Sequence, residues 1–151
     1  LRLYLNGLVF RAAYYSFYIC YLIKAIMKDF QKLIQIVKRK AALDQGNAWS
    51  NGSSTYLEEI KKEVDEVVEE IPKQRDSYLE DELADVLWDY LNVLAALEQE
   101  RGISSEAVLA RACDKYEERI AGLESGKRWA DIKQVQKEKL AKEQQERVCR
   151  A

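Results

Sequence analysis

Acidic side chains recur at helical spacing in two neighbouring stretches of this sequence, and carboxylates at such spacing can hold a cation or move a proton. In the first stretch, YLEEIKKEVDEVVEEI, four of them fall at intervals of four, three and four residues: Glu59, Glu63, Glu66 and Glu70. These intervals place them on one face of a helix, with Leu, Ile and Val on the opposite face. Taken alone, the pattern is typical of a solvated helix face.

The second stretch, EDELADVLWDYLNVLAAL, carries Glu82, Asp85 and Asp89 on one helical face. Between Leu83 and Leu97 the only charged residues are Asp85 and Asp89, which predicts a helix that is buried on most sides. Two carboxylates one turn apart repel each other and lose hydration on burial, which is costly without a partner. Since this stretch contains no Lys or Arg, a bound divalent cation is the partner that fits.

Only a short turn joins the two acidic stretches, so we expect two antiparallel helices that pack against each other. An ExxE pair, Glu63 and Glu66, then faces an ExxD pair, Glu82 and Asp85. Four carboxylates that converge in a partly dry cleft suit Mg²⁺, with Mn²⁺ as an alternative, and leave coordination positions for water and phosphate.

The composition excludes several other kinds of site. The chain has no His, which removes Ser-His-Asp and Cys-His arrangements and the usual zinc ligands. Its 24 Lys and Arg against 26 Asp and Glu give a net charge of −2, so we expect no nucleic-acid partner. The three cysteines, Cys20, Cys113 and Cys149, are far apart and form no CxxC pair, and a cytoplasmic location is therefore expected.

The pattern of apolar and turn residues predicts that long helices position these side chains. One Pro and six Gly leave too few turns for a β fold, and amphipathic spacing recurs along the chain. Capping boxes at Thr55 and Glu58 and at Ser77 and Glu80 indicate two helix starts. We therefore expect an all-α fold, an antiparallel helical bundle with a four-helix core completed by oligomerisation, with helices near 27–43, 55–71, 77–100 and 105–123.

Three segments are expected along the chain. Residues 1–26 form an apolar, tyrosine-rich N-terminal extension, 27–128 the helical domain, and 129–151 a polar C-terminal helix or tail. The uncharged run Ala12–Ile23 is too short to cross a bilayer, so no membrane partner is expected, although a membrane anchor is the alternative. Met27 is the only Met, and we interpret it as the native start.

The acidic pairs and the segments after them resemble the MazG-type all-α nucleoside triphosphate pyrophosphohydrolases over roughly Lys28–Lys139. KEVDEV and DELADVL match the family's acidic helices, DKYEER is similar to its Lys-x-x-x-Arg helix, and WADIKQVQKEK is similar to its closing Trp-x-x-x-Lys stretch. Trp49 lies where family members often carry a Pro-Trp loop, but the Pro is absent here.

This resemblance implies a Mg²⁺-dependent enzyme that hydrolyses NTPs or dNTPs to the monophosphate and pyrophosphate and so cleans the nucleotide pool. It implies the metal ligands Glu63, Glu66, Glu82 and Asp85. It also implies a set of substrate-binding residues, with Lys115 and Arg119 on the leaving pyrophosphate, Trp49 on the base, and Asp89 and Asn92 on the ribose. Because His is absent, we expect Glu59 to hold the attacking water as a general base or hydrogen-bond acceptor.

Several alternatives stay open. A related fold acting on dUTP or phosphoribosyl-ATP would carry the same acidic pairs. A non-catalytic helical module would use the apolar helix Leu83–Leu97 as a dimer core. For any one acid, an ion pair with Lys115 or Arg119 is the alternative to a metal, and these two could instead pair with Glu118 or Asp114. In each case we expect a homodimer or homotetramer, because one small bundle cannot cover Leu83–Leu97.

Overall fold

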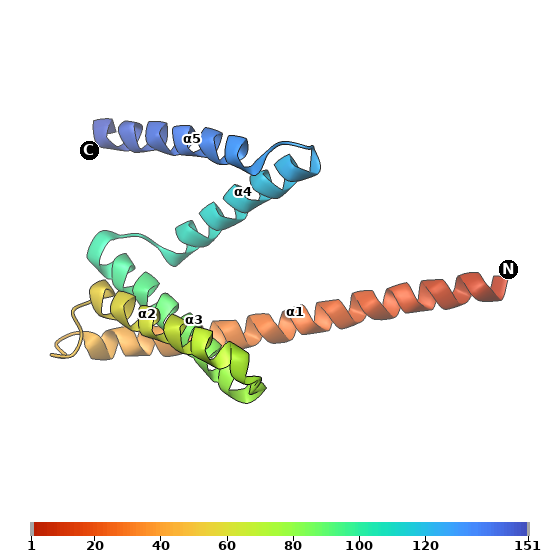
Figure 1. The fold of residues 1–151 in the computed structure, drawn as a ribbon, viewed down its shortest axis with the longest axis horizontal. Coiled ribbons are helices and arrows are strands. Elements are labelled where there is room, and N and C mark those ends of the chain that lie inside the picture. Colours follow the sequence, from red (N-terminus) through yellow and green to blue (C-terminus); the bar gives the residue numbers. More distant parts are fainter. Residues whose placement is uncertain (1, 151) are drawn as a thin grey trace. The chain divides into compact units, whose positions relative to one another are not determined.

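The computed structural model describes residues 2–150 and the side chains of residues 21–149. Five α-helices and one short 3-10 helix, η1, follow one another, and the described residues contain no strand (Figure 1): α1 Arg2–Asp44, α2 Ser53–Glu70, η1 Ile71–Lys73, α3 Asp76–Arg101, α4 Ser105–Glu124 and α5 Trp129–Arg150. The predicted all-α fold class is confirmed. Among the described residues, no helix combines the length and the apolar character that crossing a membrane requires.

The helix predicted from Met27 is the second half of a longer helix, since α1 runs without a break from Arg2 to Asp44 (Figure 1). The side chains of residues 1–20 lie outside the described residues, so the expected N-terminal extension at 1–26 and the native start at Met27 stay predictions.

The start of α2 differs from the sequence prediction. Thr55 lies inside the helix, where its Oγ1 accepts a hydrogen bond from the Asn51 N–H at 2.8 Å, so the capping box is wrong. The carboxylate of Glu100, on α3, binds the first turn instead. It accepts hydrogen bonds from the Ser53 N–H at 2.6 Å and from the Ser53 hydroxyl at 2.7 Å. An acceptor from the neighbouring helix thus replaces the local cap.

The chain divides into two compact units, residues 1–101 and 102–151. In the first unit, α2 packs along α3, and α1 packs against α3. Buried side chains from all three helices form its core: Val37, Tyr56, Leu91, Val93 and Leu94. Burying each aliphatic side chain contributes about 1.5–3 kcal/mol, and Tyr56 is the residue that α2 adds to this core.

The carboxylate of Glu70 stabilises the turn between α2 and α3. Only 3% of this residue is exposed, and its carboxylate binds the Arg75 guanidinium at 2.7 and 2.6 Å and the Lys73 ammonium at 3.1 Å. The hydrogen bonds from Arg75 lower the pKa of Glu70 to about 2. The last acid of the predicted stripe therefore closes the turn that folds α3 back onto α2.

The second unit is the helix pair α4 and α5. Gly122 lies against Ile132, and a Cβ at Gly122 would meet the Ile132 Cδ1 at 2.4 Å, so a side chain there would force the buried Ile132 side chain to shift. Ion pairs Arg111–Glu143 and Glu118–Lys139, each at 2.6 Å, join the two helices further along. The predicted boundary at residue 129 stays a prediction.

Candidate functional site

The short turn at η1 brings three of the predicted metal ligands together. Glu63 and Glu66 on α2 and Glu82 on α3 each place one carboxylate oxygen within 4.8 Å of the other two. Two oxygens bound to one octahedral Mg²⁺ lie about 3.0 Å apart in cis positions and about 4.2 Å apart in trans positions, given the Mg–O distance of about 2.1 Å. The three side chains would therefore have to rotate toward one another to hold a divalent cation, and we call this group the acidic cluster.

The acidic cluster carries negative charge that no ion pair with a described residue neutralises. Within residues 21–149, the side chains of Glu63, Glu66 and Glu82 make no ion pair and no hydrogen bond. Burial raises the pKa of Glu63, and the charges of Glu66 and Asp85 raise it further. Burial also raises the pKa of Glu82, and Glu66 adds to the effect. A bound divalent cation would reverse both shifts, so this donor set fits a metal.

Asp85 and Asp89 lie further along α3. Asp85 is exposed and is not part of the closely spaced group, although its charge raises the pKa of Glu63 and of Glu82. Asp89 is only 6% exposed, and its side chain has no partner among the described residues. Burial raises the pKa of Asp89 to about 6, and the charges of Glu59 and Asp85 contribute. Asp89 is thus a buried carboxyl group whose pKa lies well above that of an ordinary aspartate.

Glu59, the expected general base, lies on α2, and its charge is the largest electrostatic contribution to the raised pKa of Asp89. Its carboxylate is half-buried and forms an ion pair with Lys62 at 2.8 Å. Sequence reasoning missed Lys62, although its spacing of three residues from Glu59 on a helix favours such a pair.

Trp49 lies in the loop between α1 and α2, and 51% of it is exposed. Its ring stands edge-on to the ring of Tyr56, with centroids 5.8 Å apart, and the Lys40 ammonium lies 4.8 Å from its centroid. Lys40 also donates to the Tyr56 hydroxyl at 2.9 Å, and that hydroxyl donates to Asp44. Tyr56 and Lys40 therefore contact the Trp49 ring, and Asp44 binds Tyr56; the sequence pattern did not single out any of these three residues.

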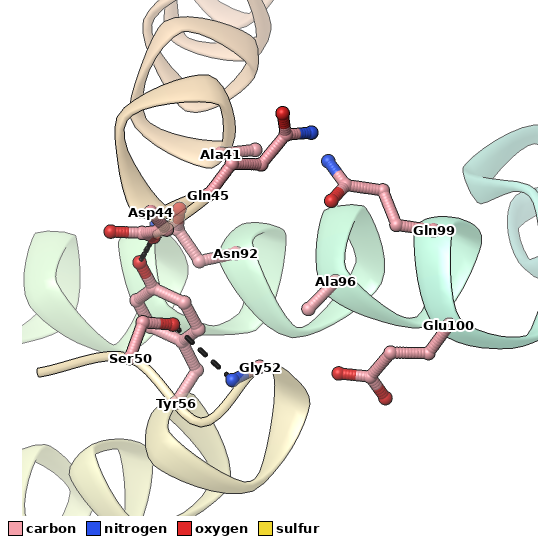
Figure 2. A pocket seen from close by; sticks show the side chains of 10 residues that line it. All are labelled: Ala41, Asp44, Gln45, Ser50, Gly52, Tyr56, Asn92, Ala96, Gln99 and Glu100. Atoms are coloured by element: carbon pink, nitrogen blue, oxygen red, sulfur yellow. Dashed lines mark hydrogen bonds between the residues drawn. The ribbon is translucent and has the colours of Figure 1, made fainter. Parts of the chain in front are cut away.

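Asn92 is the most deeply buried polar residue of the first unit, with 1% exposed. Its Nδ2 donates to the Trp88 carbonyl oxygen at 2.8 Å, whereas its Oδ1 has no hydrogen-bond partner among the described residues. A buried acceptor without a partner costs about 1–3 kcal/mol. Asn92 lines a cavity of about 150 Å³ formed by the end of α1, the following loop, the start of α2 and α3 (Figure 2). We call this space the Asn92 cavity.

The predicted basic residues belong to the second unit. Arg119 is 7% exposed; its Nε donates to Gln136 Oε1 at 2.8 Å, and its guanidinium lies 4.7 Å from the Trp129 ring centroid. Lys115 is exposed, with its ammonium 5.2 Å from the Tyr116 ring centroid. Neither of the two pairs with Glu118, which binds Lys139 and Gln136 instead. Both line a groove of about 640 Å³ between α4 and α5.

Residues 51–122 match the family model of the MazG nucleotide pyrophosphohydrolase domain. The matched segment contains α2, α3 and most of α4, and with them the acidic cluster, Asn92, Lys115 and Arg119, whereas Trp49 lies just before it. No significant match was found among curated proteins or among solved structures. The acidic helices and their antiparallel pairing agree with this match, and residues 51–122 are similar to the MazG nucleotide pyrophosphohydrolase domain.

Proposed function

We propose that this protein is a Mg²⁺-dependent enzyme that hydrolyses nucleoside or deoxynucleoside triphosphates to the monophosphate and pyrophosphate. The observation that carries the proposal is the acidic cluster, in which three carboxylates from two helices converge without a cation from the described chain. The cluster lies inside the segment that matches a pyrophosphohydrolase domain. A triphosphate is itself anionic, so a cation is needed before it can approach these carboxylates.

In this proposal Glu63, Glu66 and Glu82 hold the metal, and Asp85 completes the set. Bound Mg²⁺, or Mn²⁺ in its place, would supply charge neutralisation and polarise the phosphate oxygens. The half-buried carboxylate of Glu59 accepts a proton from the attacking water, whose oxygen joins the monophosphate as pyrophosphate leaves.

The remaining roles concern the substrate. Lys115 and Arg119 stabilise negative charge on the leaving pyrophosphate, because each is a cation that forms no ion pair with another described residue. Trp49 offers an exposed ring for stacking, and Asp89 and Asn92 follow the acidic cluster along α3 toward the sugar. We further propose that the protein works as a homodimer or homotetramer that removes unwanted nucleotides in the cytoplasm.

The test is an assay of pyrophosphate release from each NTP and dNTP, including dUTP, with Mg²⁺. Substituting Glu63→Gln or Glu82→Gln should lower kcat/KM at least about 100-fold, because a metal ligand contributes several kcal/mol to the transition state. Glu69→Gln is the matched control, since it removes the same charge from an exposed position on α2 outside the acidic cluster. Equal activity in all three variants, or no turnover by the wild type, would refute the proposal.

A further inference from the structure

The apolar face of α1 extends well beyond the part of the helix that is buried. On this face, Val37 is buried and Leu33 is half-buried, in the half of α1 that precedes α2. Toward the N-terminus the face continues at helical spacing through four residues whose exposed fractions lie between 37% and 65%: Leu22, Ile23, Ile26 and Phe30. We call these four residues the α1 apolar stripe. All side chains of residues 21–32 are exposed, so the described part of the chain leaves the stripe uncovered.

The face of α1 opposite to the stripe is cationic. Lys24, Lys28 and Lys32 follow one another at intervals of four residues, and all three are exposed. None of them forms an ion pair within residues 21–149. A helix with an apolar face and a lysine-rich face binds at the surface of a lipid bilayer, with the apolar side chains at the level of the acyl chains.

The charge of α1 favours an anionic lipid surface over a second copy of the helix. The helix carries eight Lys and Arg against two Asp, whereas the rest of the chain carries 16 against 24. Two copies of α1 that paired along the stripe would bring like charges together, without the opposite charges that flank paired helices. Anionic headgroups, in contrast, attract clustered Lys and Arg side chains.

The acidic remainder of the chain does not prevent such binding. Ile23 precedes Leu33 by ten residues, which is about 15 Å along a helix. This distance is about two Debye lengths at physiological ionic strength, so the repulsion between the acidic helices and an anionic surface is largely screened at the stripe.

The sequence of the N-terminal half of α1 fits the boundary between lipid and water. Arg11 is the only charged residue between positions 3 and 20, and five of the nine tyrosines of the chain lie before residue 22. Tyrosine rings are enriched where a bilayer meets water, and the described one, Tyr21, is 65% exposed. The uncharged run is too short to cross a bilayer, but a helix that lies in the plane of its surface has no such length requirement.

We propose that residues 2–32 of α1 bind to the surface of an anionic lipid bilayer. The α1 apolar stripe lies among the upper parts of the acyl chains, and Lys24, Lys28 and Lys32 lie at the headgroups. The inference goes beyond the proposed function and does not depend on it, because no residue of the stripe belongs to the acidic cluster.

The test measures binding of the full chain to vesicles by flotation, using phosphatidylcholine alone and an equimolar mixture of phosphatidylcholine and phosphatidylserine. Wild-type protein should bind the mixed vesicles at least tenfold more tightly. Ile26→Ser should lower binding to the mixed vesicles at least tenfold, because the stripe loses an aliphatic side chain. Ile36→Ser is the matched control, since Ile36 is another exposed isoleucine of α1 outside the stripe, and it should bind like wild type.

A second set of variants tests the charge. Each Lys near an anionic surface contributes about fivefold to the binding constant, so replacing Lys24, Lys28 and Lys32 together by Gln should cost about 100-fold on mixed vesicles. Binding to phosphatidylcholine alone should not change. The control replaces three exposed lysines of α5 by Gln: Lys133, Lys137 and Lys142. Helical circular dichroism would confirm that each variant is folded.

Three results would overturn the proposal. The first is no binding of wild-type protein to either kind of vesicle, and the second is equal binding to both. The third is a dimer in lipid-free solution, measured by light scattering, that Ile26→Ser dissociates and Ile36→Ser does not. In that case a second copy of the chain covers the stripe instead of lipid.

Discussion

At the scale of single residues, this site is distinguished by carboxyl groups whose charged form is disfavoured by burial and by the repulsion of neighbouring carboxylates. Glu63, Glu82 and Asp89 all have raised pKa values with burial as the leading cause, whereas Glu70 on the same helix pair has a lowered pKa because of Arg75 and Lys73. The direction of the pKa shift therefore distinguishes Glu70, whose ion pairs stabilise the fold, from the carboxyl groups that form no ion pair and are candidates for a functional site.

Asp89 predicts the pH dependence of stability in metal-free protein. Because its pKa is raised from 3.8 to about 6, the folded state binds the proton more tightly than the unfolded state. The free energy of unfolding should therefore fall as the pH rises between these values, and the loss should be complete above pH 6. Urea unfolding of wild type and Asp89→Asn in EDTA measures this difference. A wild-type-minus-variant difference that does not change with pH would contradict the prediction.

Glu70 predicts a dependence of opposite sign. Its pKa is lowered from 4.5 to about 2, so its ion pairs stabilise the fold fully above pH 4.5 and lose this effect as the pH falls toward 2. Glu70→Gln should be less stable than wild type at pH 7, and the two should converge in acid. Glu69→Gln, whose side chain is exposed, serves as the control and should behave like wild type at each pH.

At the scale of elements, the packing of α2 against α3 places both the acidic cluster and the Asn92 cavity, and the start of α2 depends on its neighbour. Gly52 has a φ of +68°, and a Cβ there would lie 2.0 Å from the Glu100 Oε1 that caps Ser53. The cap therefore needs a glycine at this position, both for the backbone conformation at φ +68° and ψ −141° and for the close approach of Glu100.

Gly52→Ala should destabilise the protein by about 2–3 kcal/mol, because φ +68° and ψ −141° form a backbone conformation open almost only to glycine and because the Glu100 cap is lost. Gly46→Ala is the matched control, since Gly46 also has a positive φ but no atom lies within 4 Å of its added Cβ. That variant should lose only the backbone contribution of about 1 kcal/mol. Chemical unfolding measures the free energy of unfolding of both variants. Equal losses of stability would show that Glu100 does not cap α2.

The same elements show what a sequence can predict. Helical period and a short turn were enough to predict that Glu63, Glu66 and Glu82 meet, because these features are local. The cap of Ser53 by Glu100, 47 residues away, was missed because it forms only once the helices have packed. The Asn92 cavity was missed for the same reason, since its walls come from four separate segments. Asp85 lies outside the closely spaced group, although its charge still raises the pKa of Glu63 on α2.

At the scale of the whole molecule, apolar side chains exposed on α3 favour self-association. Leu83, Leu87 and Tyr90 recur at helical spacing on one face, and between 39% and 51% of each is exposed. An apolar face of this kind marks an interaction surface. We expect a homodimer or homotetramer, and Leu87→Glu should shift the mass measured by light scattering toward the monomer. A wild-type protein that is monomeric at all concentrations would contradict this.

The central claim is that one divalent cation binds between Glu63, Glu66 and Glu82. Anomalous diffraction from crystals grown with Mn²⁺ measures it directly, because the ion is located independently of any activity. The account predicts an anomalous peak coordinated by carboxylate oxygens from both α2 and α3. Crystals in which no peak lies there, with the three side chains turned to solvent or each paired with a Lys or Arg, would contradict it.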